Sequence, residues 1–394
     1  MARLARACAT HFYIAIAGCG GGGSAPSTPP PDPQLVAVIA DLVHGALDPS
    51  FPGRGTVDYP YSEPADIPKA YAMVVRAGST SAGTDASLGA LGSTSLDWLL
   101  SHADEDHDGI PGWGLPFPWD AFGDGSPNEA NATYAISTAI VIDALIDRAG
   151  QATGERRASL IDLALQAILP YLADSAASPG GVAPYSLSTQ DRPYTVFNTA
   201  AYIAAMAQRL SNQGVPPARA EELRSFADRT MQLLLESRLL APSGAWYWPY
   251  MASSTSLNDL PHASYIAYAI QTYARHGGRW ASSFPLAIIR LHLRDFVLGA
   301  SGEVRAYPAF SGIESPARSY DIGFALVALC SSDDHDIADV RSALTHAIPR
   351  YRTNDGHYAK LPLTAAGPSP PVINEYETYL LYAAASCLDA DARR

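Results

Sequence analysis

The chain has 394 residues, of which 47% are hydrophobic and 16% charged, so it can bury one large core or two modest ones and is typical of a globular protein. Its formal net charge of −13 argues against nucleic acids and anionic membrane surfaces as partners, because both require a basic face. Lys69 and Lys360 are the only lysines. This arginine bias is typical of a GC-rich genome and by itself indicates no chemistry.

The N-terminus has the pattern of a signal peptide. Arg3 and Arg6 precede a mostly apolar run that ends in IAGC at residues 16–19. The run is too short for a spanning helix and is interrupted by His11. Its end resembles the bacterial lipobox, which implies that Cys19 becomes the lipid-bearing first residue. An ordinary secretory signal is the alternative.

This start predicts three parts of the chain: a signal peptide over 1–19, a Gly/Pro/Ser-rich tether over 20–33, and a single domain over 34–394. We expect a protein of the bacterial cell envelope, held by its lipid, or else a secreted one. The lipid is then the only contact with a membrane, and we expect a monomer.

The first functional feature along the domain is a loop of about 27 residues that begins at Asp104 and is rich in acids, Gly, Pro and Trp. Loops of that size in compact domains are usually functional. We interpret it as the rim of a binding cleft, where Trp113 and Trp119 offer flat faces to a sugar ring and Asp120 and Asp124 meet the substrate. The alternative is a rigid connector whose tryptophans plug the edge of the core.

Within this loop Asp104, Asp106 and Asp108 alternate and are followed by Gly109. The pattern resembles the first half of an EF-hand or dockerin calcium loop, in which alternate carboxylates surround a hard cation. It departs from that loop at Leu115, where the closing glutamate would stand. We predict a structural calcium ion here, or else a solvated acidic turn. No other cofactor is required.

The rest of the domain predicts helical hairpins. Apolar patterns begin near residues 133, 198, 262, 320 and 375, at intervals of 55–65 residues, and most follow loops rich in Gly, Pro, Asn and aromatic residues. Segments 155–174 and 216–238 have one charged face, whereas 198–210, 262–274 and 320–331 are apolar nearly all round. Further helices are expected at 34–47, 66–76 and 86–102, and no convincing alternating strand is present.

Alternating buried and half-exposed helices predict an all-α fold, an α/α toroid of five to seven hairpins with an inner and an outer ring. An open α-solenoid is the alternative. The period, the Trp- and Gly-rich loops and the polar starts of the inner helices resemble the six-hairpin glycosidase-like superfamily. That superfamily includes glycoside hydrolases, polysaccharide lyases and uronyl epimerases. The resemblance covers most of 60–390 and is architectural, without a motif that matches residue by residue.

Glycoside hydrolysis requires two carboxyl groups, one protonated and one ionised. The candidates stand in loops before the inner helices or at the helix starts, and they are Asp120, Asp124, Glu129, Asp259, Asp321, Glu375 and Glu377. We favour Asp124 and Glu375, because an aromatic, low-charge setting raises a carboxyl pKa. Each is otherwise a helix cap or a surface acid.

A lyase or epimerase instead requires a base and an acid beside the reacting carbon, together with a group that neutralises a uronate. Asn198, His262, Tyr265, Arg318 and Tyr320 lie at or near three consecutive inner-helix starts. Toroidal lyases use such a set of residue types, which makes elimination or epimerisation the alternative reaction. His262 is otherwise a capping or core histidine.

Trp246, Trp248 and Tyr250 are spaced two residues apart and point the same way in an extended chain, so they offer a second sugar platform or pack at the barrel edge. Cys330 and Cys387 lie at equal depth in two similar helices, and in an oxidising compartment a disulfide between them is possible. Two reduced, buried cysteines are the alternative.

Together these features predict a carbohydrate-active enzyme of the cell envelope that cleaves a poly- or oligosaccharide. A non-catalytic glycan-binding or structural lipoprotein is the third possibility.

Overall fold

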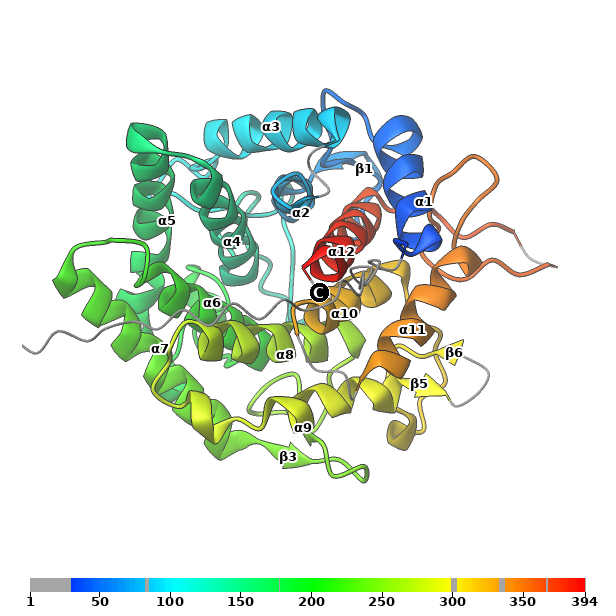
Figure 1. Cartoon of the computed structure of the whole chain (residues 1–394). Coiled ribbons are helices and arrows are strands. Elements are labelled where there is room, and N and C mark those ends of the chain that lie inside the picture. The colour runs from blue at the N-terminus through cyan, green and yellow to red at the C-terminus, as the bar shows by residue number, and fades with distance from the viewer. Residues whose placement is uncertain are drawn as a thin grey trace, which may run out of the picture. The chain divides into compact units, whose positions relative to one another are not determined.

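Six buried helices form a closed inner ring in the computed structural model, which describes residues 30–81, 85–176, 178–298, 303–332, 337–365 and 368–393. They are α2 (Pro68–Ala77), α4 (Ala135–Gln151), α6 (Phe197–Leu210), α8 (Leu260–Arg275), α10 (Ser319–Cys330) and α12 (Asn374–Ala392). Each packs against the next, and α12 packs against α2 (Figure 1). This closure distinguishes the toroid from an open solenoid.

An outer ring of amphipathic helices surrounds the inner one (Figure 1). It consists of α1 (Pro33–Asp41), α3 (Ala86–Ser101), α5 (Gly154–Ser175), α7 (Pro217–Ser237), α9 (Leu286–Leu291) and α11 (Ala338–Ala347). Five of them pair with the inner helix that precedes them in the chain, whereas α1 packs against α12. The sixth hairpin is therefore built from the two ends of the domain. The all-α toroid predicted from the helical pattern is confirmed.

Local sequence explains where several helices start. Asp32 caps α1 by accepting the N–H of Gln34 at 2.9 Å, and proline occupies the first helical position. Asp85 caps α3 in the same way and accepts the N–H groups of Ser87 and Leu88. Short polar side chains before apolar runs thus fix these boundaries.

The contact between α10 and α12 is close. A Cβ atom on Gly323 would lie 3.0 Å from the backbone of Tyr379, so any larger residue would push the two helices slightly apart. Further along the same pair, Cys330 and Cys387 are joined by a disulfide with a Cα–Cα distance of 4.9 Å. Both cysteines predicted to pair are thus bonded in the structure.

The remaining regular structure is short and lies in the connections. Three two-residue antiparallel pairs are formed by β1 (Arg54–Gly55) with β2 (Ala65–Asp66), β3 (Leu239–Leu240) with β4 (Trp246–Tyr247), and β5 (Val297–Leu298) with β6 (Glu303–Val304). A π turn, Leu42–Ala46, follows α1, and 3₁₀ turns occupy Pro179–Gly181, Thr189–Asp191, Ala281–Ser283, His292–Phe296, Ala309–Ser311 and Ile348–Arg350.

Residues 31–394 form one compact unit. No helix among the described residues is long and apolar enough to cross a membrane. The signal peptide, the lipid-bearing Cys19 and the tether up to residue 29 lie outside the described residues and remain predictions.

Two apolar clusters stabilise the unit. The larger lies between the inner and outer rings. The smaller lies under the loops at the end of the barrel where the inner helices begin, and it includes Leu115, Phe117, Tyr134, Tyr185 and Val196. This second cluster holds the long loops in place, because loops without apolar contacts would not present a fixed surface.

Candidate active site

A cavity of about 400 Å³ opens at the end of the barrel where the inner helices begin. All six inner helices contribute a residue from the helix start: Lys69 of α2, Ser137 of α4, Asn198 of α6, His262 of α8, Tyr320 of α10 and Glu375 of α12. The positive ends of six helix dipoles therefore meet around one chamber, which favours negative charge inside it.

His262 lines this cavity and is paired with a carboxylate. Its Nδ1 forms a short hydrogen bond with Asp259, and its side chain is 29% exposed. Asp259 is also the N-cap of α8, accepting the backbone N–H of His262 at 3.4 Å. Among the described residues, no hydrogen bond reaches Nε2. With Nδ1 held by a carboxylate, Nε2 is the ring nitrogen that is left for a proton transfer.

Arg318 lies behind this pair. Its guanidinium donates from one terminal nitrogen to Asp259 Oδ2 and from Nε to Asp321 Oδ1, each at 2.8 Å. Burial raises the pKa of Asp259, but the adjacent His262 and Arg318 outweigh burial and lower it. Asp321 is completely buried, and burial raises its pKa to about 7 against the opposing effect of Arg318.

A buried ion pair between α2 and α12 forms another part of the wall. Lys69 Nζ lies 2.7 Å from Glu375 Oε1 and donates to the Tyr59 hydroxyl at 3.3 Å. Burial lowers the pKa of Lys69, yet the neighbouring Glu375 holds it above its ordinary value. Lys69 is therefore a cation at neutral pH, and Glu375 is its counter-ion.

A second carboxylate, Asp58, lines the cavity and is bound by Lys360 and by the hydroxyl of Tyr376. Burial raises its pKa, but these hydrogen bonds and the charge of Lys360 lower it below the ordinary range. Both cavity carboxylates, Asp58 and Glu375, are therefore engaged by lysines.

Tyrosine hydroxyls supply neutral donors on the floor. The hydroxyl of Tyr265 lies 2.5 Å from that of Tyr320 and 2.9 Å from that of Tyr379. Burial raises the pKa of all three phenols, so they remain protonated at neutral pH.

Aromatic rings form most of the remaining wall. Tyr59, Trp119, Tyr134, Tyr185 and Tyr250 all line the cavity. Trp119 meets the ring of Tyr59 edge to face at a centroid distance of 4.9 Å. Such faces suit the C–H surface of a sugar ring, while the hydroxyls and the charged pairs suit its oxygen atoms.

The structure does not place Asp124, predicted to be catalytic, at this cavity. Its side chain is exposed and does not line the cavity. Hydrogen bonds from Ser126 and from Tyr194, the latter at 2.6 Å, lower the pKa of this carboxyl, whereas a general acid needs a raised one. The neighbouring aromatic rings, Phe122 and Tyr194, stack on each other at 3.9 Å and leave the carboxyl in solvent.

Three predicted sugar platforms are packing residues instead. Trp113 and Trp248 are buried, and their indole N–H groups donate to the carbonyls of Leu99 and Leu234. Trp246 lies in β4 under the guanidinium of Arg238 at 4.4 Å, away from the cavity. These positions agree with the alternatives stated above, a core plug for Trp113 and packing at the barrel edge for Trp246 and Trp248.

Asp120 is also misassigned as a substrate-binding residue. Its carboxylate accepts the backbone N–H groups of Phe122, Gly123, Asp124 and Gly125, at 2.7–3.3 Å. It therefore shapes the loop from within.

The other predicted residues do converge. Trp119, Asn198, His262, Tyr265, Arg318, Tyr320 and Glu375 all line the cavity. Sequence reasoning missed Asp58, Tyr59, Lys69, Tyr134, Tyr185 and Tyr376, which line it as well. One signal was available, because both lysines of the chain bind carboxylates of this cavity. The rarity of lysine was attributed above to genome composition, yet both lysines form ion pairs here.

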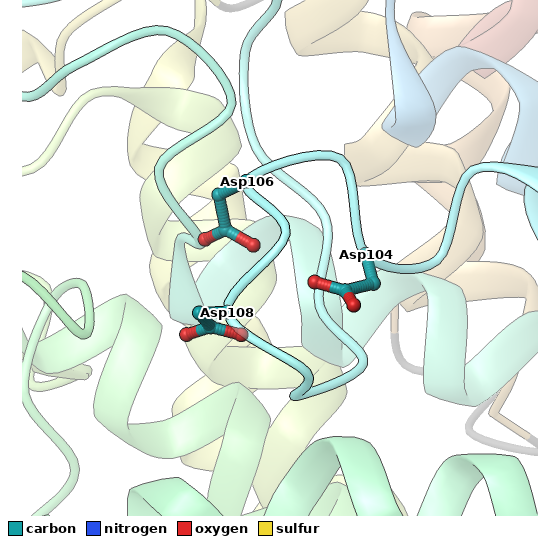
Figure 2. A group of neighbouring side chains, drawn as sticks. All are labelled: Asp104, Asp106 and Asp108. Atoms are coloured by element: carbon teal, nitrogen blue, oxygen red, sulfur yellow. The ribbon is translucent and has the colours of Figure 1, made fainter.

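The predicted calcium loop brings its three aspartates together. One carboxylate oxygen of each of Asp104, Asp106 and Asp108 lies within 4.8 Å of the others, as the turned-in side chains in Figure 2 show. Gly109 has φ 81°, a conformation that favours glycine, and its N–H donates to Asp104 at 3.2 Å. Burial and then the neighbouring Asp108 raise the pKa of Asp106. Calcium binding remains a prediction.

No protein-family model matches the sequence, and no curated protein does either. Solved structures do match the fold. A GH76 alpha-mannanase from Bacteroides thetaiotaomicron superposes with a TM-score of 0.61 at 10% identity, covering 90% of this chain and 94% of that one. A sugar epimerase from a ruminal bacterium gives 0.62 at 13% identity, covering 91% and 99%.

A cellobiose 2-epimerase from Bacillus thermoamylovorans gives a TM-score of 0.60 at 13% identity, also covering 91% of this chain and 99% of that one. The six-hairpin glycosidase-like architecture is therefore confirmed. At these identities the likeness establishes the fold alone.

Proposed function

We propose that the protein is a carbohydrate-active enzyme in which His262 transfers a proton to or from the substrate. The observation that supports this most is the Asp259–His262 pair, in which Asp259 holds Nδ1 of a histidine that lines a tyrosine-rich chamber at the helix N-termini. The fold is shared with a mannanase and two sugar epimerases, which agrees with a saccharide substrate.

Each part of the cavity has a role in such a reaction. His262 Nε2 removes a proton from the carbon next to a carbonyl or carboxylate, and the imidazolium that forms is stabilised by Asp259. The hydroxyls of Tyr265 and Tyr320 donate to the oxygen on which negative charge develops, with help from the surrounding helix N-termini. The Lys69–Glu375 pair binds sugar hydroxyls, and Trp119 stacks on a ring. Epimerisation, isomerisation and elimination all begin with this step.

Hydrolysis is the second candidate, because Asp58 and Glu375 are two carboxylates in one cavity. It ranks below proton transfer at carbon. A hydrolase needs one carboxyl that is protonated, and both of these are engaged by a lysine.

One experiment separates the candidates. The protein is incubated in D₂O with a panel of neutral and uronic saccharides, and three signals are followed: deuterium on substrate carbon, absorbance of unsaturated products, and new reducing ends. Deuterium without cleavage indicates epimerisation or isomerisation, and absorbance with new ends indicates elimination. New ends alone indicate hydrolysis and contradict the proposed reaction. Affinity without any product supports the glycan-binding alternative.

We also propose that the protein is anchored in the bacterial envelope through Cys19. The support is the lipobox-like end of the N-terminal segment. A Cys19→Ser variant is expected to leave the membrane fraction in fractionated cells. A parent protein that is itself found in the soluble fraction would contradict the anchor.

A further inference from the structure

A chain of alternating charges lies directly behind His262 and links two inner helices. From α8 it comprises His262 and its partner Asp259, and from α10 it comprises Arg318 and Asp321. Arg318 bonds Asp259 Oδ2 at 2.8 Å while Asp259 Oδ1 holds the imidazole, so the two oxygens of one carboxylate serve two different partners. The orientation of His262 thus depends on a residue of the neighbouring helix.

We propose that Arg318 and Asp321 are positioning residues for His262, with Asp321 fixing the guanidinium that holds Asp259 in place. The inference rests on the proposed role of His262 in proton transfer. Arg318 fixes the plane of the Asp259 carboxylate, and that carboxylate in turn fixes which ring nitrogen faces the cavity.

A role in helix capping does not account for Asp321 fully. Its Oδ2 accepts the backbone N–H of Arg318 at 2.8 Å, which completes a capping box at the start of α10. Its Oδ1 accepts the Arg318 guanidinium, which a cap does not require. A completely buried carboxylate carries a large desolvation cost, which Arg318 offsets in part while it also reaches across to Asp259 at the start of α8.

Tyrosines from several elements surround this chain. Tyr307 faces Asp259, Arg318 and Asp321, and Tyr320 and Tyr376 face Arg318. Tyr250 and Tyr265 lie against the His262 ring at centroid distances of 5.1 and 6.1 Å. Tyr351 faces Asp321, and its hydroxyl donates to the Ala317 carbonyl at 2.7 Å. These phenols are neutral, so the charges of α8 and α10 that act on His262 are those of Asp259, Arg318 and Asp321. From other elements, Asp58 interacts with Arg318 and is itself paired with Lys360.

The test is an NMR titration of the His262 ring in the full chain, with the signal assigned by its loss in His262→Gln. Asp259→Asn is expected to lower the titration midpoint of His262 by about 1–3 pH units, because the adjacent negative charge is lost. Asp321→Asn is expected to lower it by a smaller amount. Arg318→Gln removes the positive charge and is expected to raise it.

Asp85→Asn is the matched control, because Asp85 caps α3 and does not line the cavity. It is expected to leave the His262 midpoint unchanged. If Asp321→Asn and Arg318→Gln both titrate like the parent, the positioning role is overturned and Asp321 is only a cap. If Asp321→Asn does not fold, Arg318→Gln alone tests the proposal: an upward shift of the His262 midpoint supports it, and an unchanged midpoint overturns it. The titration needs no substrate, so it is independent of the turnover that tests the proposed function.

Discussion

The same six helices form a cavity at each end of the barrel, and the two cavities differ in chemistry. The one at the helix N-termini is lined by tyrosines, His262 and two lysine-bound carboxylates. The one at the helix C-termini, of about 540 Å³, is lined by polar groups that include Arg76, Asp147, Arg209 and Arg275. Buried charged groups line the barrel at both ends, so burial and charge alone do not identify which cavity is the candidate active site.

The charges at the C-terminal end have a structural explanation. Arg76 is buried and bonds Asp143 at 2.8 Å, Asp147 at 2.9 Å and the Tyr268 hydroxyl at 2.6 Å. Arg275 donates to the carbonyl of Ser331 just beyond the end of α10, where the helix dipole is negative. Burial, with Arg209 and Arg275 nearby, lowers the pKa of His276 to about 4, so this histidine is neutral near pH 7. The arginines at this end therefore form ion pairs with carboxylates or hydrogen bonds with carbonyls at helix ends.

The connections between helices also differ in length at the two ends of the barrel. Segment 102–134 precedes α4 at the N-terminal end, whereas only 152–153 joins α4 to α5 at the other end. Long loops supply Trp119 and the small apolar cluster, while short connections supply only helix ends. The cavity that the long loops cover therefore receives side chains that the cavity at the other end does not.

The largest expected effect concerns His262. His262→Gln is expected to reduce turnover by about 10²–10⁴-fold while the fold persists, because the proton-transfer group is lost. The matched control is His292→Gln, since His292 bonds Asp295 through Nδ1 at 2.9 Å but lies outside the cavity. Turnover per folded molecule is expected to be unchanged there. Full turnover in His262→Gln would remove His262 from the mechanism.

At the other end, Arg76→Met is expected to cost up to about 3–5 kcal/mol of the free energy of unfolding, because the buried Asp143 loses one of its two arginine partners and keeps only Arg209. Denaturant unfolding followed by circular dichroism measures the loss. Arg219→Met, which removes an exposed pair with Glu222, is expected to cost under about 1 kcal/mol. Equal losses in both variants would contradict a structural role for Arg76.

Two tryptophans compare a cavity wall with a packing site. Trp119→Ala is expected to weaken saccharide binding about threefold to tenfold, as the loss of one aromatic contact implies. Trp246→Ala is expected to leave affinity unchanged, because Trp246 lies away from the cavity. Isothermal calorimetry with a saccharide that the D₂O experiment identifies gives both values. A larger loss in Trp246→Ala would reverse the assignment.

Acid is expected to destabilise the protein partly through Asp58. Its pKa is lowered in the folded state, mainly by Lys360 and Tyr376 against the effect of burial. Its stabilisation is therefore present above the unfolded pKa of about 3.9 and is lost as the pH falls through the folded value. Unfolding free energies measured between pH 5 and pH 3 are expected to fall less steeply in Asp58→Asn. Asp97→Asn, a change on the exposed face of α3, is the control and should follow the parent.

The smallest expected effect concerns the acidic loop. Millimolar calcium is expected to stabilise the protein by about 1 kcal/mol through Asp104, Asp106 and Asp108, which corresponds to a weak extracellular-type site. Thermal unfolding with calcium and with EDTA measures it. Asp106→Asn is expected to abolish the difference. If calcium does not change the melting temperature of the parent protein, the loop is a solvated acidic turn and not a calcium site.

Helical periodicity predicted the scaffold well. The apolar segments predicted at 198–210, 262–274 and 320–331 became α6, α8 and α10 within two residues at each end. Their burial on all sides follows from the sequence, because a helix without a polar face has to be covered. The equal depth of Cys330 and Cys387 in neighbouring helices placed them opposite each other.

The site was predicted where it lies on that periodic scaffold and poorly elsewhere. His262, Tyr320 and Glu375 occupy the first turns of inner helices, and all three line the cavity. Asp124 and Trp113 lie in a loop with no repeating pattern, where composition did not indicate which side chains turn inward. In the structure Asp124 is exposed to solvent and Trp113 is buried in the core.

The sequence by itself determined the rings of helices and the end of the barrel at which loops gather, because both follow from patterns within single segments. Only the tertiary structure decided which side chains share the cavity. Lys69 and Glu375 come from opposite ends of the domain, and their contact exists because α12 closes against α2. The partners of Arg318 likewise come from two helices, so no local pattern specifies them.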